Sequence, residues 1–293
     1  MTTLRQIFTS ARQFLFIPFS VFLLLACSGC DPMRTYEHQG TQRQYLFHKP
    51  ANLSASAPLV IALHGYGGNA RLFRFYSDLD DLADEKGFAV AYPQGVEEET
   101  GKAYWDASLE LVPGADDVGF LTGLAKALQM EHGLDADRIF LFGFSNGGFM
   151  AYTLACQAPE TFRAMASVLG TMSGHDWRHC QPSTPLPVLQ ITALDDRTVP
   201  PDGSLGVKGG WGGAPPVAQV VEFWQQQNRC SDRDQKNFPP HTRADYCRRG
   251  VAGNEVWFYT IENFGHGWPD SKDDTGIDAI AVVWEFFENA MQD

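Results

Sequence analysis

The chain has 293 residues, 44% of them hydrophobic, so it is long enough to bury one large core. Its formal net charge of −13 at pH 7 argues against a nucleic-acid partner, because binding to phosphates requires a basic surface. There are 28 glycines and 17 prolines, but an aromatic content of 13% favours a folded protein with many turns over a disordered one.

The first 26 residues have the features of an export signal. Arg5 and Arg12 form a positively charged N-terminal region. The apolar run from Phe14 to Ala26 that follows is too short to span a membrane comfortably. The run ends in Leu24-Leu25-Ala26-Cys27, which resembles a bacterial lipobox. This resemblance implies cleavage before Cys27 and a lipid on its sulfur, and plain secretion with cleavage nearby is the alternative. In both cases we expect an exported chain.

Export to an oxidising compartment favours disulfides among the other cysteines. Cys156 and Cys180 flank a predicted strand, and Cys230 and Cys247 flank a polar loop that contains proline, so these local pairs are the simplest disulfides. Cys30 is left over, close to the expected lipid. Metal binding is the competing interpretation, but no Cys-x-x-Cys lies inside the domain, and we expect no metal.

Short apolar runs alternate with amphipathic segments along the rest of the chain. Strands are expected at residues 45–47, 59–63, 88–92, 139–142, 165–169, 188–192 and 255–261, and helices at 72–86, 119–131, 149–157, 217–227 and 278–291. This alternation predicts an α/β fold with a mostly parallel sheet and helices on both faces. Because no repeat or low-complexity linker divides it, we expect one domain over residues 40–293, preceded by a tether over residues 27–39.

One stretch, Gly143-Phe144-Ser145-Asn146-Gly147, fits the pattern G-x-S-x-G. It lies between a predicted strand and a predicted helix, and that context is typical of a nucleophile elbow. Such a turn holds the serine in a strained conformation that exposes its Oγ, and the following helix N-terminus offers N–H groups to an anion. A glycine-rich turn with an incidental serine is the alternative.

A serine hydroxyl is a poor nucleophile unless a base takes its proton, so a catalytic serine here requires a carboxylate and a histidine further along the chain. Asp195 and Asp196 follow the strand at 188–192, and His266 follows the strand at 255–261. Both positions lie just past the carboxyl ends of strands, where active sites of open α/β sheets gather. The alternative for His266 is a surface histidine. Five further histidines lack this combination of chain order after the serine and carboxylate and position after a strand. They are His64, His132, His175, His179 and His241.

Five motifs occur in a specific order. They are His64-Gly65-Tyr66-Gly67-Gly68, Tyr92-Pro93-Gln94-Gly95, Asp116-Asp117-Val118-Gly119-Phe120, Gly143-Phe144-Ser145-Asn146-Gly147-Gly148 and Gly265-His266-Gly267-Trp268-Pro269. Over about residues 40–290 the chain resembles the secreted esterases grouped as polyhydroxybutyrate depolymerases and feruloyl or acetylxylan esterases. The resemblance implies an α/β-hydrolase fold and a serine carboxylic-ester hydrolase that forms an acyl-enzyme intermediate.

The resemblance also implies residue roles, with Ser145 as nucleophile and His266 as base. The acid of this family usually lies in a His-Gly-Thr-x-Asp-x-x-Val-Pro segment, and Thr192-Ala193 replaces the His-Gly here. Counting back from Val199-Pro200 gives Asp196 as the acid, with Asp195 as the alternative. Near His266, Phe264 and Gly267 replace the usual extra glycine and threonine, at the expected rim of the pocket.

Backbone N–H groups of Asn146 and Tyr66 are the expected oxyanion hole, because Tyr66 lies in the loop directly after the strand at 59–63. Trp105, Trp211 and Trp268 lie in loops and are candidate aromatic walls for the substrate, with buried packing as the alternative. Asp116 is expected to cap the helix that follows it. This chemistry requires no metal or organic cofactor.

Two other functions compete with the esterase. One is a peptidase on the same scaffold, which lacks support because no gating domain is evident. The other is a catalytically dead hydrolase fold that binds a ligand as a lipoprotein, which the intact serine, acid and histidine disfavour. The expected partner is an ester: feruloylated or acetylated polysaccharide, a hydroxyalkanoate oligomer or a small ester. Contact with a membrane is expected only through the N-terminal lipid anchor.

Overall fold

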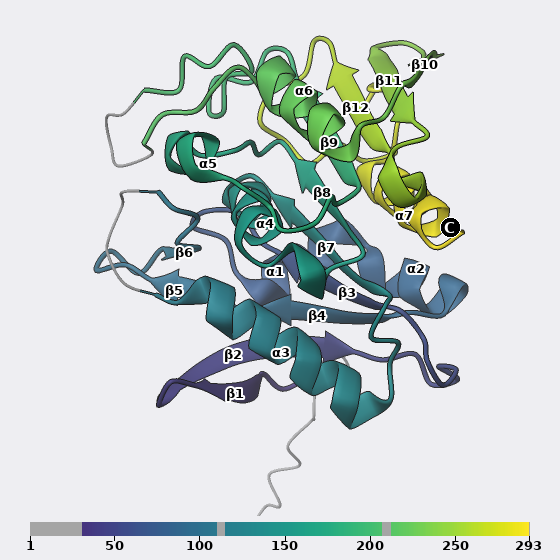
Figure 1. Cartoon of the computed structure of the whole chain (residues 1–293). Helices are drawn as coiled ribbons and strands as arrows, with labels where there is room; N and C mark the ends of the chain where they lie inside the picture. The colour runs from purple at the N-terminus through teal and green to yellow at the C-terminus, as the bar shows by residue number, and fades with distance from the viewer. Residues whose placement is uncertain (1–30, 110–114, 207–211, 293) are drawn as a thin grey trace, which may run out of the picture. The chain divides into compact units, whose positions relative to one another are not determined.

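A sheet in the order β1-β2-β4-β3-β7-β8-β9-β12-β11-β10 forms the centre of the computed structural model, which describes residues 31–109, 115–206 and 212–292 (Figure 1). The neighbours from β4 to β12 pair in parallel. The pairs at the two edges are antiparallel. The sheet is therefore mostly parallel, as the sequence predicts.

The strands of this sheet are β1 (Arg34–His38), β2 (Thr41–His48), β3 (Leu59–Leu63), β4 (Ala89–Pro93), β7 (Ile139–Phe144), β8 (Ala164–Val168), β9 (Val188–Ala193), β10 (Asp232–Phe238), β11 (Thr242–Arg248) and β12 (Val256–Ile261). A separate antiparallel ribbon pairs β5 (Val96–Glu97) with β6 (Ala103–Tyr104).

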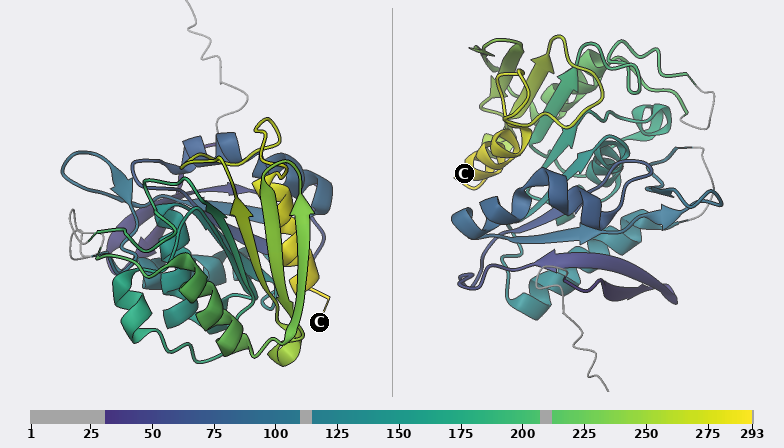
Figure 2. Two further views of the ribbon diagram at one scale, coloured as in Figure 1. Left: turned by 90° about the horizontal axis from the view of Figure 1, so that it is seen from above. Right: turned by 180° about the vertical axis from the view of Figure 1, so that it is seen from behind.

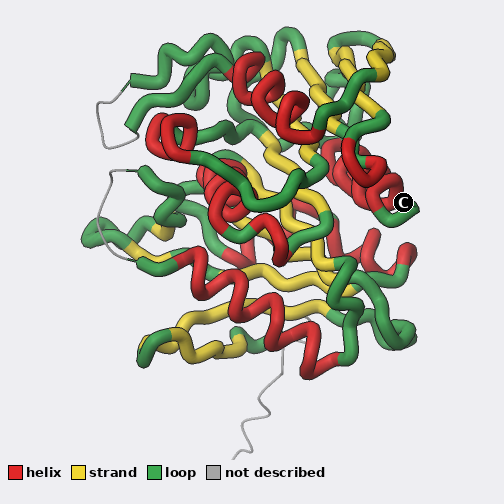
Figure 3. The backbone as a smooth tube through the Cα atoms, viewed as in Figure 1, coloured by secondary structure: helices red, strands yellow, loops and turns green. Residues whose placement is uncertain are grey.

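Helices cover both faces of the sheet (Figures 2 and 3). One face carries α3 (Asp117–His132), α4 (Asn146–Gln157), α5 (Gly174–His179) and α6 (Val217–Asn228). The other face carries α1 (Ala70–Ser77), α2 (Leu79–Lys86) and α7 (Ala279–Ala290). Short 3₁₀ turns lie at Pro159–Thr161 and Val251–Gly253.

Each face of the sheet has its own hydrophobic core. Alternate residues of β3 show the division, because Ile61 packs into the core beneath α3, α4 and α6, whereas Val60 and Ala62 pack into the core beneath α1, α2 and α7. All of β3 is buried. A strand covered on both faces must be apolar at every position, which explains the continuous hydrophobic runs in the sequence.

The structure differs from the sequence expectation in several places. The single helix expected at 72–86 is two helices, because Asp78 adopts a left-handed conformation with φ of 52° between α1 and α2. The expected tether ending at residue 39 includes β1, which pairs with β2 along its whole length. The polar loop expected between Cys230 and Cys247 is the hairpin β10–β11 at the sheet edge. Its outer strand is almost wholly exposed, so no apolar alternation marks it.

The described residues from 32 to 292 form one compact unit. Among the described residues, none of the helices has the length and apolar character needed to span a membrane. The expected signal at 1–26, with Cys27 and Cys30 after it, lies outside the described residues.

Candidate active site

Ser145 stands at the turn between β7 and α4 and has the backbone angles φ 54° and ψ −118°. A β-carbon at Gly147 would lie 2.3 Å from the carbonyl oxygen of Leu63, so only glycine fits where the turn meets β3. The Ser145 N–H donates to the Val168 carbonyl at 2.9 Å, which joins the turn to β8. The turn therefore has the strained geometry of a nucleophile elbow, with the serine fixed from both sides.

His266 lies between the serine and an aspartate. Its Nε2 is 2.8 Å from the Ser145 Oγ, and its Nδ1 is 2.6 Å from the Asp196 Oδ2. Ser145, Asp196 and His266 follow β7, β9 and β12, whose parallel pairing through β8 brings their carboxyl ends to one edge of the sheet. Residues up to 121 positions apart in the sequence thereby form one continuous hydrogen-bonded chain.

The structure distinguishes between the two neighbouring aspartates. Asp196 is 4% exposed, and its Oδ1 accepts hydrogen bonds from the backbone N–H groups of Thr198 at 2.8 Å and Val199 at 2.9 Å. Asp195 is exposed and does not contact His266 through any hydrogen bond in the described structure. The two N–H donors orient the Asp196 carboxylate so that its other oxygen faces the imidazole. Asp196, rather than Asp195, is thus the partner of His266.

The loop after β3 passes directly beside the serine. A β-carbon on Gly65 would lie 3.3 Å from the Ser145 Cβ, so the glycine allows this close approach. The loop is closed by a hydrogen bond from the Gly68 N–H to the Gly65 carbonyl, and the Gly67 N–H donates to the Ala103 carbonyl at 2.7 Å. Tyr66 therefore lies on a loop that is fixed against both the elbow and β6.

His64 fixes this loop from the inside. It is 1% exposed, and its Nε2 accepts a hydrogen bond from the Gly95 N–H at 3.1 Å. The hydrogen must then be on Nδ1, which donates to the Gly65 carbonyl at 2.8 Å. Burial lowers the pKa of His64 to about 4, so the ring is neutral at pH 7. Sequence reasoning excluded His64 as the base but did not find this structural role.

Asn146 is the first residue of α4, and its backbone N–H is among those that a helix leaves without an intrahelical acceptor. Its side chain is clamped to Trp105, since the Oδ1 accepts from the Trp105 N–H at 2.7 Å and the Nδ2 donates to the Trp105 carbonyl at 3.2 Å. Both residues are fully buried. The N–H of Asn146 therefore has a fixed direction next to the serine.

The three tryptophans expected as substrate walls have different positions. Trp105 is fully buried and its indole N–H donates to the His64 carbonyl at 2.9 Å, so the alternative of buried packing applies to it rather than a substrate wall. Trp268 is half-buried and packs edge-on against Phe144, whose ring lies 5.4 Å from that of His266. Trp268 therefore stays a candidate wall. Trp211 lies outside the described residues.

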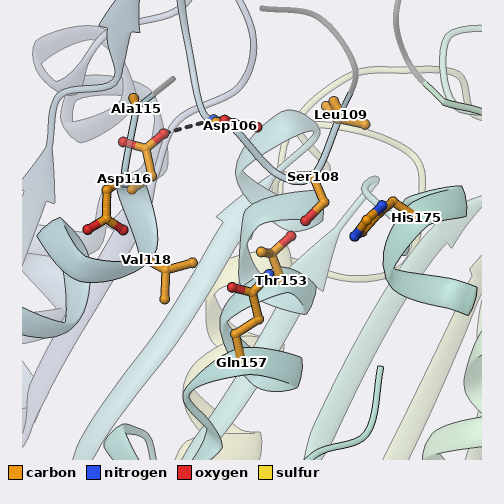
Figure 4. Close-up of a pocket in the computed structure, with 10 residues that line it drawn as sticks. Asp106, Ser108, Leu109, Ala115, Asp116, Val118, Thr153, Gln157 and His175 are labelled. Carbon is orange, nitrogen blue, oxygen red and sulfur yellow. Dashed lines mark hydrogen bonds between the residues drawn. The ribbon is translucent and has the colours of Figure 1, made fainter. Parts of the chain in front are cut away.

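A cavity of about 380 Å³ lies beside α4 (Figure 4). Thr153 and Gln157 of α4 line it on one side, with His175 of α5 and the segment from Asp106 to Leu109 around them. At the start of α3, Asp116 caps the helix through the Gly119 N–H at 2.8 Å, as expected. Neither Ser145 nor His266 lines this cavity, so it is separate from the proposed reacting atoms.

Two disulfides, Cys156–Cys180 and Cys230–Cys247, confirm the expected pairing. The first joins the ends of α4 and α5, and the second joins the segment after α6 to β11. Across the described ranges no group of three or more histidine, cysteine, aspartate and glutamate side chains is arranged to hold a metal ion.

A mostly parallel sheet with helices on both faces, a nucleophile elbow, and an acid and a histidine after later strands define the class of α/β-hydrolases. A solved acetyl xylan esterase from Aspergillus awamori has the same fold, with a TM-score of 0.65 and 16% identity over 88% of this chain and 100% of that chain. The α/β-hydrolase fold that the sequence predicts is thereby confirmed.

Residues 43–196 match the family described as esterase PHB depolymerase. Over 252 residues the chain is 31% identical to the putative esterase NocK of Nocardia uniformis subsp. tsuyamanensis, and this covers 78% of the chain and 72% of that protein. Feruloyl esterase B of Piromyces equi is 28% identical over 74% of this chain, which spans 41% of that longer protein. The chain therefore belongs to the esterase PHB depolymerase family, and it is a carboxylic ester hydrolase.

Proposed function

We propose that the chain hydrolyses carboxylic esters with Ser145 as nucleophile, His266 as general base and acid, and Asp196 as the group that orients the imidazole. The observation that carries this proposal is the continuous chain from the Ser145 Oγ to the His266 Nε2 at 2.8 Å and from the His266 Nδ1 to the Asp196 carboxylate at 2.6 Å. The carboxylate accepts the Nδ1 hydrogen, which leaves Nε2 free to take the serine proton.

Acylation begins when the Ser145 oxygen attacks the ester carbonyl carbon and its proton passes to the His266 Nε2. The carbonyl oxygen becomes an oxyanion, which accepts hydrogen bonds from the backbone N–H groups of Asn146 and Tyr66. His266 then gives the proton to the departing alcohol, and the acyl group stays on Ser145. Water then takes the place of the alcohol, and His266 removes its proton as the water oxygen attacks the acyl carbon. His266 returns the proton to the Ser145 oxygen, and the acid is released. No metal or organic cofactor takes part in this scheme.

The names of relatives support this substrate class, since feruloyl esterase B and acetyl xylan esterase are named for feruloyl esters and for acetylated xylan. The candidate esters are acetylated or feruloylated polysaccharide, hydroxyalkanoate oligomers and small esters. Phe144 and Trp268 form an aromatic surface next to His266, which suits contact with an apolar acyl or alcohol group.

A peptidase and a catalytically inactive binding protein remain the competing functions. The inactive protein is disfavoured by the complete hydrogen-bonded chain through His266, because a fold retained only for ligand binding does not require it. We expect peptides to be poorer substrates than esters of the same acyl group, because an amine is a worse leaving group than an alcohol.

The test is hydrolysis of p-nitrophenyl acetate, methyl ferulate, acetylated xylan and hydroxybutyrate oligomers by wild type and by Ser145→Ala. We expect wild-type turnover of at least one ester and a loss of about a million-fold in Ser145→Ala. Turnover by Ser145→Ala within tenfold of wild type would overturn the assignment of the nucleophile. Turnover of peptides but not of esters by wild type would favour the peptidase. The absence of any turnover by wild type would favour the inactive binding protein.

We also propose that the protein is exported and carries a lipid at Cys27. The lipobox-like stretch Leu24-Leu25-Ala26-Cys27 carries this proposal, and two disulfides suit an oxidising compartment. Labelling with a radioactive fatty acid tests it: wild type is expected to take up label, and Cys27→Ser to lose it and release active enzyme. No label on wild type would leave plain secretion, and label surviving in Cys27→Ser would place the lipid on Cys30.

A further inference from the structure

Trp105 contacts both halves of the proposed oxyanion hole. Through its backbone N–H and carbonyl it makes two hydrogen bonds to the Asn146 side chain, at 2.7 and 3.2 Å. Through its indole N–H it donates to the carbonyl of His64 at 2.9 Å. Asn146 and the loop that begins at His64 carry the two expected oxyanion donors. One residue thus spans the two segments that must keep a fixed separation.

These hydrogen bonds lie where water cannot replace them. Trp105 and Asn146 are fully buried, and His64 is 1% exposed. The Trp105 and His64 rings also pack on each other, with their centroids 5.1 Å apart. A buried carbonyl or amide that loses its partner carries the full desolvation penalty, so this arrangement strongly favours a single geometry.

The backbone next to Trp105 is itself held in place. The N–H of Asp106 donates to the Asp117 Oδ2 at 2.8 Å, the contact drawn as a dashed line in Figure 4. The other oxygen of Asp117 accepts from the Arg43 Nη2 at 2.6 Å in a buried ion pair. Arg43 lies on β2 and Asp117 at the start of α3, so the segment that carries Trp105 is tied to the frame of the fold.

We propose that Trp105 is a positioning residue that sets the distance between the two oxyanion donors, and that its indole N–H is the part that does so. This inference rests on the proposed function. Trp105 is fully buried and acts through the Asn146 side chain and the His64 carbonyl. Trp105 should therefore stabilise the transition state, in which the oxyanion exists, and should not change the binding of the uncharged ester.

The test compares Trp105→Phe with a matched control, Trp224→Phe. Trp224 of α6 is also fully buried, but its indole N–H has no hydrogen-bond partner in the described structure. Both changes remove a similar volume, and only the first removes a hydrogen bond beside the hole. Kinetic constants are expressed per active site, titrated to completion with a phosphonate that reacts with Ser145, so that misfolded protein does not contribute.

We expect Trp105→Phe to lower kcat by about 10- to 100-fold, less than the loss of a whole oxyanion donor, with KM within about twofold of wild type. The inhibition constant of a trifluoromethyl ketone should rise by a similar factor, because Ser145 adds to its carbonyl and creates an oxyanion while His266 takes the proton. Trp224→Phe should leave kcat and the inhibition constant unchanged.

A second variant keeps the test valid if Trp105→Phe does not fold. Asn146→Ala retains the backbone N–H and removes the clamp from the other side, and it should also lower kcat without raising KM. The inference is overturned if folded Trp105→Phe keeps kcat within twofold of wild type, or if Asn146→Ala does so where Trp105→Phe does not fold. It is also overturned if only KM changes, or if Trp224→Phe loses as much kcat as Trp105→Phe. Ser145→Ala in the same series separates the two proposals: if it is inactive while Trp105→Phe is normal, only the positioning role fails, and if it is active both fail.

Discussion

A Cβ atom on Gly143 would lie 2.1 Å from the carbonyl oxygen of Gly147, so the two glycines that flank Ser145 exclude a side chain from the inside of the turn. The obstacle is backbone, which cannot rotate away as a long side chain can. The pattern G-x-S-x-G is therefore a steric requirement of this elbow, and the position of the nucleophile depends on it.

Gly143→Ala should destabilise the fold and displace Ser145. We expect a loss of about 3 kcal/mol in the free energy of unfolding, at the upper end of the cost of overpacking, with a large loss of activity. Urea denaturation measures it. Gly265→Ala is the control for stability, because a β-carbon there would meet nothing within 4 Å and φ is not positive. Equal stabilities of the two variants would contradict the steric argument.

Asp196→Asn should lower kcat by roughly 10⁴-fold, because an amide can present its own N–H to the imidazole and favour the wrong tautomer. The neighbouring change Asp195→Asn should have little effect, since that side chain is exposed. Steady-state hydrolysis of p-nitrophenyl acetate by the two variants decides between the aspartates. A greater loss in Asp195→Asn would move the acid to that residue.

The stability of the protein should fall in mild acid because of His64. Its pKa is about 4 in the folded protein against 6.5 as an ordinary value, so the unfolded chain binds more protons between these pH values. The contribution of His64 is complete above pH 6.5 and is lost as the pH falls toward 4, by about 3 kcal/mol in all.

Urea denaturation of wild type and His64→Gln across this pH range measures that contribution. The glutamine variant lacks the titrating ring, so its free energy of unfolding should depend less on pH than that of wild type. Identical pH dependence in the two proteins would show that His64 is not held neutral in the folded state.

The disulfides should contribute stability rather than catalysis. They close segments of 24 and 17 residues, and each should stabilise the fold by about 3 kcal/mol. Cys156→Ser with Cys180→Ser, and Cys230→Ser with Cys247→Ser, should lower the urea midpoint while kcat of the folded protein stays within about twofold. A loss of kcat without loss of stability would point to a role near Ser145 instead.

The sequence predicted those parts of the fold that local pattern controls. Apolar runs such as β3 are buried on both faces and stand out from their surroundings, and the residues that follow β7, β9 and β12 gave the candidate triad. By contrast, β10 is almost wholly exposed, so its pattern resembles that of a loop. The break at Asp78 left no signal either, because aspartate is compatible with a helix.

The residues that hold the expected oxyanion hole show a different limit of prediction from sequence. Trp105 lies in a loop, and burial there depends on contacts with His64 and Asn146, each 41 residues from it in the sequence. A contact between residues so far apart in the chain leaves no periodic pattern in the sequence. The cue that was available was the position of the loop directly after β3, which predicted an oxyanion donor at Tyr66 but not the residues that hold the loop.

The proposed mechanism requires that Ser145 becomes acylated, and mass spectrometry of the enzyme quenched in acid during turnover of p-nitrophenyl acetate tests this directly. We predict one acetyl group on the peptide that contains Ser145 in wild type, and none on that peptide in Ser145→Ala. An acetyl group on another residue during productive turnover, or turnover by Ser145→Ala at a rate near that of wild type, would contradict the proposed mechanism.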